Sequence, residues 1–422
     1  MARLNRWNIQ AIFCLLILIC LSPMFSKQSE GCTIAVVSGR VTPDQRPLLW
    51  KNRDTSSREN DVRYFNDGLL RCVAVIDQHD ADRIWMGMNE AGFCIENSLS
   101  RDLPRGSSIG FGNGRFMKQA LQTCRTAADF EALLDRTNVT GRRTRANFAV
   151  IDAAGAAVLY EAGHKSFAKF DANDPETAPH GFIVRSNFSM TASKPKAIEL
   201  GGFDRVYSGG RYLRAERLLR QELQRNGTID YRFFLETCSR DLSDPRLPIS
   251  SKTQLKPVVD TRSTINRYNT VAAAVFQGVR QDEPNDLTTM WTMLGEPVFS
   301  VAVPCWVKTD QSDSIAKQQL KLDSLCAAVC ELRQASYTED DERILRTRHL
   351  NRIWSRTIRA EKEIVDRTTV QLAQWRKTTP QTRTLLKFQE AMAAIAMRAL
   401  LDVRSRDPQF EPAIAQKKRR AS

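Results

Sequence analysis

The sequence predicts an α+β fold, in which largely antiparallel sheets form a layered sandwich and a helical segment follows them. Between residues 32 and 308, short apolar runs of strand length are separated by turn residues. Helical patterns interrupt this series instead of alternating strictly with it, which favours α+β over a parallel α/β arrangement. Beyond residue 309, charged residues become frequent and apolar residues recur at helical spacing.

The expected strands are runs rich in valine, isoleucine and other apolar residues, and several are apolar on both faces, as in covered sheets. They lie at 33–37, 47–50, 72–76, 84–88, 93–97, 148–151, 156–161, 182–184, 271–276 and 298–303. The turn sequence at 152–155, Asp-Ala-Ala-Gly, predicts a hairpin between two of them. Helices are expected at 116–134, 211–225 and 231–238.

Residues 1–31 have the features of a signal peptide. A basic start is followed by an unbroken apolar run at 11–21, and Ser29 and Gly31 place small residues at the −3 and −1 positions before Cys32. The apolar run is shorter than the roughly 20 residues that a membrane span needs. We therefore expect a secreted or periplasmic protein cleaved near Gly31–Cys32; an uncleaved N-terminal anchor is the alternative.

Residues 309–422 predict a helical, basic C-terminal extension after a 32–308 catalytic domain. Its apolar positions form a stripe that predicts a packing face. These positions include Leu350, Trp354 and Ile358 and, beyond Pro380, Phe388, Met392 and Ile395.

The chain is strongly basic, with a formal charge of +14, and from residue 309 onward it has 22 basic and 15 acidic residues. A basic balance is compatible with nucleic-acid binding. A secretory leader and the lack of a recognition motif argue against that partner. Solvated helix faces, or peripheral contact with an anionic envelope surface, account for the charge. The oligomeric state is not determined by the sequence.

Cysteine and histidine usage predicts neither a disulfide framework nor a metal site. Ten cysteines include two in the leader, and without Cys32 an odd, irregularly spaced set of seven remains. Cys326 and Cys330 lie four residues apart on one face of an expected helix, but no histidine or second pair is near them. None of the four histidines has ligand spacing. We expect no metal and no cofactor.

The stretch 32–54 contains the candidate chemistry. Cleavage before Cys32 would give one residue both a thiol and a free α-amine, whose ordinary pKa near 8 suits a base at neutral pH. A nucleophile paired with its base is the requirement for covalent acyl transfer, and no histidine is needed. Lys51-Asn52-Arg53-Asp54 then places a cation and a carboxylate three residues apart. These features predict attack on an amide.

Five motifs in order resemble the N-terminal-nucleophile (Ntn) hydrolases of the choloylglycine hydrolase and penicillin V acylase type. The set is closer still to acyl-CoA:6-aminopenicillanate acyltransferase-like proteins, several of which resemble linear-amide hydrolases. The match covers roughly residues 32–306. The motifs are Cys32 with its apolar strand, KNRD at 51–54, MNEAGF at 88–93, RSN at 185–187 and SGGRY at 208–212, with VFQGV at 275–279 and MWTMLGEP at 290–297 in addition.

The resemblance implies a four-layer αββα core and a set of catalytic roles. Cys32 would supply the thiolate and the amine, and Asp54 would hold the amine. The Asn187 side chain would donate to the oxyanion, with the backbone N–H of Asn89 as second donor. Arg211 would order the site.

Lys51 departs from the better-known relatives, which carry arginine there. Lysine keeps a charge that lowers a thiol pKa, but it lacks the planar fork that holds two acceptors. Taken singly, Lys51 and Asp54 also fit a strand-end ion pair, and Asn89 fits a turn cap.

The predicted function is a secreted amidohydrolase acting on a small-molecule linear amide. Three alternatives remain: an acyltransferase, a cysteine protease with a histidine base, and a non-enzymatic envelope-associated binding protein. The amide substrate is not determined, because specificity depends on loop shape. Self-cleavage and signal peptidase could each expose Cys32. The candidate histidine bases are His79, His164, His180 and His349.

Overall fold

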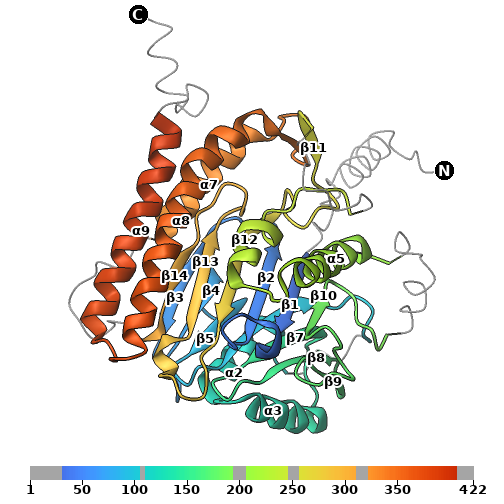
Figure 1. Cartoon of the computed structure of the whole chain (residues 1–422). Coiled ribbons are helices and arrows are strands. Elements are labelled where there is room, and N and C mark those ends of the chain that lie inside the picture. The colour runs from blue at the N-terminus through green and yellow to red at the C-terminus, as the bar shows by residue number, and fades with distance from the viewer. Residues whose placement is uncertain (1–30, 105–109, 193–205, 246–255, 310–321, 406–422) are drawn as a thin grey trace, which may run out of the picture. The chain divides into compact units, whose positions relative to one another are not determined.

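The computed structural model describes residues 31–104, 110–192, 206–245, 256–309 and 322–405. Two antiparallel sheets form its centre, one with the strand order β10-β1-β2-β12-β13-β14 and one with the order β3-β4-β5-β6-β7-β8-β9 (Figure 1). The first sheet contains β1 (Gly31–Val37), β2 (Leu48–Asp54), β10 (Phe182–Arg185), β12 (Thr270–Gln277), β13 (Thr289–Leu294) and β14 (Val303–Cys305). The second contains β3 (Asn60–Phe65), β4 (Cys72–Asp77), β5 (Met86–Asn89), β6 (Cys94–Leu99), β7 (Ala146–Ile151), β8 (Ala157–Ala162) and β9 (Phe167–Asp171).

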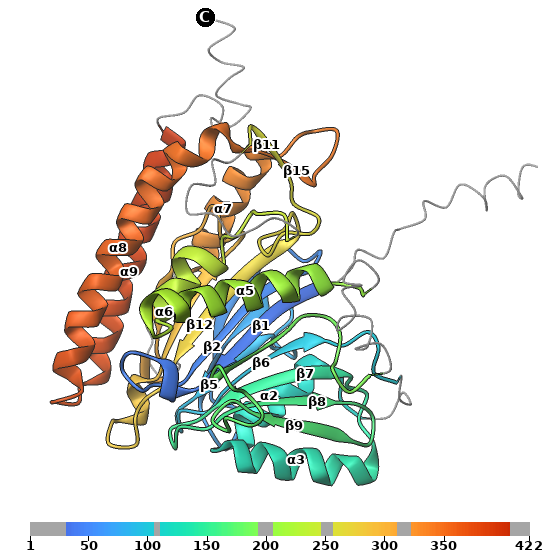
Figure 2. The same ribbon diagram turned by 45° about the vertical axis from the view of Figure 1, so that its right-hand side comes forward.

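Helices cover the outer face of each sheet, while the inner faces pack on one another. β1 contacts β6, β7 and β8 across the interface. α2 (Asn113–Thr123) and α3 (Ala127–Thr140) pack on the seven-stranded sheet in a separate apolar cluster. α5 (Gly209–Asn226), the short α6 (Tyr231–Phe233) and the π-helix η3 (Phe234–Cys238) lie over the six-stranded sheet (Figure 2). The expected four-layer αββα sandwich is confirmed.

The helix expected at 116–134 is wrong as one element, because the chain forms α2 and α3 with a break between them. Cys124 ends α2 in an extended conformation. Thr126 then caps α3 by accepting from the Asp129 N–H, and the Asp129 carboxylate accepts from the Thr126 N–H. This capping box supplies acceptors for N–H groups that a new helix leaves without partners, so it favours a fresh start.

Several strand boundaries also differ from expectation. β3, β9 and β13 were not expected, and the run at 298–303 is a strand only at its end, as β14. Residues before it form a turn in which Phe299 and Ser300 donate to the carbonyls of Glu296 and Pro297. The hairpin at Asp152–Gly155 is confirmed: Gly155 has φ 90° and donates to the Asp152 carbonyl.

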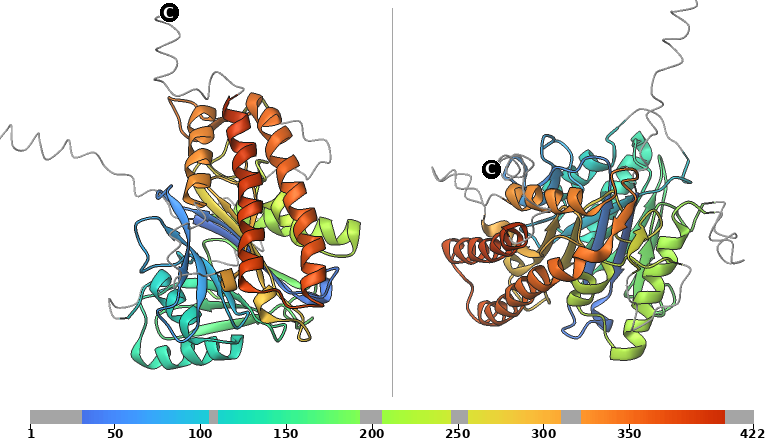
Figure 3. Two further views of the ribbon diagram at one scale, coloured as in Figure 1. Left: turned by 90° about the vertical axis from the view of Figure 1, so that its left-hand side faces the viewer. Right: turned by 90° about the horizontal axis from the view of Figure 1, so that it is seen from above.

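The expected helical segment after residue 309 is confirmed where the structure describes it. It contains α7 (Leu322–Ser336), α8 (Leu350–Trp375) and α9 (Thr382–Ser405), together with η6 (Thr347–His349) and β15 (Ile344–Arg346), which pairs with β11 (Val258–Asp260). The three α-helices, orange to red in Figure 3, pack beside one another and against β3, β13, β14 and η5 (Val307–Thr309). Many of their apolar residues belong to the same core cluster as the strands, whereas Leu372, Trp375 and Leu385 pack in a smaller cluster with Trp306.

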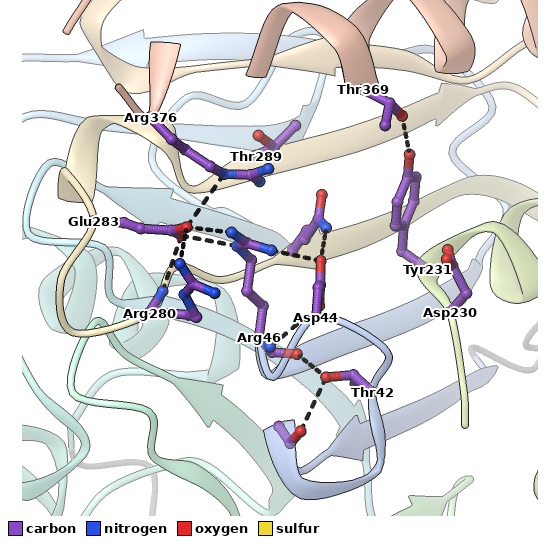
Figure 4. Close-up of polar contacts among 12 residues, drawn as sticks. Thr42, Asp44, Arg46, Asp230, Tyr231, Arg280, Glu283, Thr289, Thr369 and Arg376 are labelled. Atoms are coloured by element: carbon purple, nitrogen blue, oxygen red, sulfur yellow. Dashed lines mark hydrogen bonds and ion pairs between the residues drawn. The ribbon is translucent and has the colours of Figure 1, made fainter. Parts of the chain in front are cut away.

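Buried polar contacts also fasten this segment to the sandwich. Near the start of β2, Glu283 accepts from Arg46 and lies 3.5 Å from Nε of Arg376, at the end of α8 (Figure 4). Residues 1–30 of the predicted leader (1–31) and the basic stretch at 417–420 lie outside the described residues. Within the described residues, no helix is both long and apolar enough to cross a membrane.

Candidate active site

The pairing of β1 with β2 decides which face each candidate side chain occupies. Directly opposite residues in an antiparallel pair share a face, and the faces alternate along each strand. Cys32 pairs with Arg53, whereas Gly31 pairs with Asp54. Trp50, on the same face as Asp54, packs on Phe234 of η3 at a ring distance of 5.3 Å. Asp54 therefore lies on the helix-covered face, and Cys32 directs its side chain toward the second sheet.

Lys51 lies on the same face as Cys32 and is buried there. Its Nζ donates to the carbonyl of Trp85 at 2.6 Å and to Oδ1 of Asn97 on β6 at 2.8 Å. Burial lowers the pKa of Lys51. The strand expected at 47–50 therefore extends through KNRD, and Lys51 connects the two sheets.

The Cys32 thiol lies in a field of mixed sign. Burial raises its pKa, Lys51 and Arg53 lower it, and Asp54 both raises it by its charge and lowers it by a backbone hydrogen bond. The net shift of the thiol pKa is upward, in a chain where Gly31 still precedes Cys32. The residue itself is partly exposed.

The backbone nitrogen of Cys32 is held from the distant motifs. Its N–H donates to Oδ1 of Asn187 at 3.0 Å, and Nη2 of Arg211 donates to the same oxygen at 2.7 Å. Nη1 of Arg211 donates to the Cys32 carbonyl at 2.7 Å and to the Thr33 hydroxyl at 2.9 Å. Because the Cys32 N–H and Arg211 are both donors, the side-chain oxygen of Asn187 must be the atom that faces the Cys32 nitrogen. The NH₂ group of Asn187 therefore points away from that nitrogen.

Asp54 pairs with Gly31, the residue before Cys32, and its carboxylate has three partners from other parts of the chain. Oδ1 accepts from the Thr270 hydroxyl at 2.8 Å, while Nη1 of Arg267 and Nη1 of Arg211 lie 3.4 and 3.6 Å from Oδ2. A Cβ at Gly31 would lie 3.0 to 3.1 Å from the Arg267 and Arg211 guanidinium groups and from Oδ2. Gly31 therefore lies close to three charged side chains. After cleavage before Cys32, the free amine would face the same charged groups.

Asn89 is not part of this cluster, so its expected role as an oxyanion donor is wrong. Its N–H donates to the Phe93 carbonyl at 2.9 Å. Its side-chain amide donates to the carbonyls of Leu121 and Cys124 at the end of α2, and its oxygen accepts from the Ala91 N–H. Asn89 is a turn and helix cap on the far face of the sheet, as the alternative interpretation had it.

The open edge of β6 offers a backbone donor in its place. The β5–β6 register ends at Glu96, and Ser100 donates to Arg145 on the β7 side. Since hydrogen-bonding directions alternate along an antiparallel strand, the N–H and carbonyl of Leu99 point to the opposite, open edge. There the Leu99 carbonyl accepts from Nδ2 of Asn187 at 2.9 Å. The Leu99 N–H therefore lies on the Asn187 side.

The structure thus brings Cys32, Lys51, Asp54, Asn187 and Arg211 together from four separate motifs. Sequence reasoning missed Leu99, Arg267 and Thr270; the only signal for Thr270 was its place directly before the expected strand at 271–276.

In the part of the chain that the structure describes, the four histidines lie on other elements than Cys32. His79 pairs with Glu59 at 3.2 Å, and His164 contacts the Arg142 carbonyl at 2.6 Å. His180 stacks on Phe182 before β10, which pairs with the far end of β1. His349 precedes α8.

No family model and no curated protein matches the chain. Among solved structures, it is similar to a conjugated bile acid hydrolase from Clostridium perfringens, at 11% identity, over 67% of this chain and 94% of that one, with a TM-score of 0.44. A penicillin V acylase from Agrobacterium tumefaciens shows 12% identity over 65% and 86%, with a TM-score of 0.41. A thermostable penicillin G acylase from Alcaligenes faecalis shows 10% identity over 52% and 56%, with a TM-score of 0.31.

Proposed function

We propose that the mature chain is an amidohydrolase whose nucleophile is an N-terminal Cys32, exposed when the leader is removed during export. The observation that carries the proposal is the setting of the Cys32 nitrogen. Asn187 accepts from its N–H, Arg211 donates to Asn187, and Arg211 also lies 3.6 Å from the carboxylate of Asp54, which pairs with the preceding residue, Gly31. An ordinary strand residue needs no such set of charged and amide groups, whereas a catalytic amine does.

The steps follow from the groups present. The α-amine takes the thiol proton, and the thiolate attacks the amide carbon. The remaining Nδ2 hydrogen of Asn187 and the Leu99 N–H would stabilise the oxyanion. The protonated amine then gives its proton to the leaving amine. Water hydrolyses the thioester, which releases the acid and restores the thiol.

Lys51 has an electrostatic role in this scheme. Its charge favours the thiolate, and its bonds to Trp85 and Asn97 fix it beneath Cys32. Because Lys51 lies on the side of the thiol that faces the interior of the sandwich, the other side of the thiol is left for the substrate.

The test begins with the N-terminal sequence and intact mass of the mature protein. A chain that starts at Cys32 should release free amine from linear amides and form an acyl-enzyme visible by mass. Cys32→Ala should do neither, while Cys330→Ala, which changes another partly exposed cysteine, should keep both. A chain that starts elsewhere and still cleaves amides would overturn the proposal.

Acyl transfer to a second amine shares the first half of this reaction. Product analysis with an added acceptor amine separates the two functions. New amide in place of free acid would make the protein an acyltransferase, and free acid alone would make it a hydrolase.

A further inference from the structure

The segment 266–270, which leads into β12 and ends at its first residue, supplies two of the contacts to Asp54. Arg267 and Thr270 both contact the carboxylate, and the Arg267 N–H donates to the Thr270 hydroxyl at 2.8 Å. The Asn269 carbonyl accepts from the Thr55 N–H at 2.9 Å, which ties the segment to the end of β2. The position of Asp54 therefore depends on how this segment is held.

Buried Glu296 holds the segment from the side of β13. Its Oε1 accepts from the Asn266 amide at 2.6 Å, and the Asn266 oxygen accepts from the Val298 N–H at 3.1 Å. The Glu296 side chain has no exposed area, so its charge is balanced only by its neighbours.

The C-terminal segment provides those neighbours. Nε of Arg333, on α7, lies 3.3 Å from Oε2 of Glu296, and the Tyr337 hydroxyl donates to Oε1 at 2.8 Å. Arg333 also donates to the Tyr268 carbonyl, from Nη2 at 2.7 Å and from Nε at 3.2 Å. Arg58 donates to that carbonyl at 3.1 Å. One guanidinium thus joins α7, Glu296 and the segment beside Asp54.

We propose that α7 is a supporting element of the active site: Arg333 and Tyr337, acting with Glu296, position the 266–270 segment so that Arg267 and Thr270 hold the Asp54 carboxylate. The catalytic relevance of this role rests on the proposed function. Glu296 and Arg333 are positioning residues and touch no reacting atom.

The chain contains a matched control at the opposite end of the same strands. Glu283 is also a buried glutamate that contacts an arginine of the C-terminal segment, Arg376 (Figure 4). It lies near the start of β2, roughly 20 Å from Asp54 by the rise of a strand. Glu283→Gln therefore weakens the attachment of the C-terminal segment without touching the segment beside Asp54.

The experiment measures the rate of Cys32 alkylation by iodoacetamide against pH, peptide by peptide, in the mature protein. The groups that set this profile are the α-amine, Lys51, Arg53 and Asp54, with Arg211 and Arg267 facing Asp54. If Arg267 is held less firmly, its charge offsets Asp54 less, so the thiol and amine lose their protons at higher pH. Glu296→Gln and Arg333→Met should each slow alkylation at neutral pH by about threefold or more. The alkylation rate of Arg333→Lys should lie between the rates of these variants and that of wild type.

Glu283→Gln should keep the wild-type profile. The proposal is overturned if Glu296→Gln leaves the Cys32 profile unchanged, or if Glu283→Gln shifts it equally. If Arg333→Met does not fold, the alkylation profiles of Glu296→Gln and Arg333→Lys still test the proposal. Alkylation needs no substrate, so a wild-type protein that cleaves no amide would refute the proposed function and leave this result intact.

Discussion

The side-chain oxygen of Asn187 accepts the N–H of Cys32 at 3.0 Å, across a sequence separation of 155 residues. The same amide donates to Leu99 on the opposite sheet. One side chain therefore spans the place where the reacting group of the substrate would sit.

Asn187→Ala should lower kcat by about 10²–10³, since it removes an oxyanion donor together with the acceptor that orients the amine. Steady-state amide hydrolysis measures this. A loss of less than tenfold, with folding intact by circular dichroism, would contradict the assigned role.

Lys51→Met should raise the pKa of Cys32, because Lys51 is the largest of the charges that lower it. Alkylation of Cys32 should therefore need a higher pH than in wild type. Lys51→Arg should preserve more of the effect, since it retains the charge. An unchanged alkylation profile in Lys51→Met would refute the electrostatic role.

Asn89→Ala should destabilise the fold and leave the catalytic constants of the folded enzyme near wild type. The change leaves the Leu121 and Cys124 carbonyls without their donor, at a cost of about 1–3 kcal/mol. Urea unfolding and amide hydrolysis check the two halves. A large fall in kcat without a loss of stability would restore Asn89 to the active site.

Glu296→Gln should change how stability depends on pH. Burial raises the pKa of Glu296 from 4.5 to about 7, against the opposing effects of Arg333, Tyr337 and Asn266. The folded chain therefore binds this proton more tightly than the unfolded chain does. The resulting stabilisation is full below about pH 4.5 and is lost as the pH rises through 7.

Glutamine has no such proton, so the stability of Glu296→Gln relative to wild type should improve with pH over this range, by up to about 3 kcal/mol. Urea unfolding at several pH values measures the difference. A constant difference between pH 4.5 and 7.5 would show that Glu296 is not the titrating group.

Cys330 should be the first cysteine alkylated in a Cys32→Ala background. A hydrogen bond from Cys326 lowers the pKa of Cys330, with help from Arg58 and Arg333, and the residue is partly exposed. The other described cysteines apart from Cys32 are buried. Mass spectrometry of time-limited labelling at neutral pH tests the order, and prior labelling of Cys124 or Cys238 would contradict it.

The sequence was sufficient for features whose signals are local. The apolar runs predicted β1, β4 and β12, and ordered motifs predicted Asp54, Asn187 and Arg211 beside Cys32. It failed where position depends on distant partners. Asn89 lies in a matching motif, yet the register of β5 turns it toward α2. Arg267 and Thr270 have no motif of their own, and only the pairing of β12 with β2 brings them to Asp54.

The place of β1 within its sheet has one more consequence. Chain ends usually fray, yet this strand lies between β2 and β10, so the new terminus would have neighbours on both sides. A nucleophile at such an end has little conformational freedom left to lose when a substrate arrives. The same rigidity makes the position of the cut decisive. One surplus residue before Cys32 would turn the amine into an amide and remove the base, however well the rest of the protein were folded.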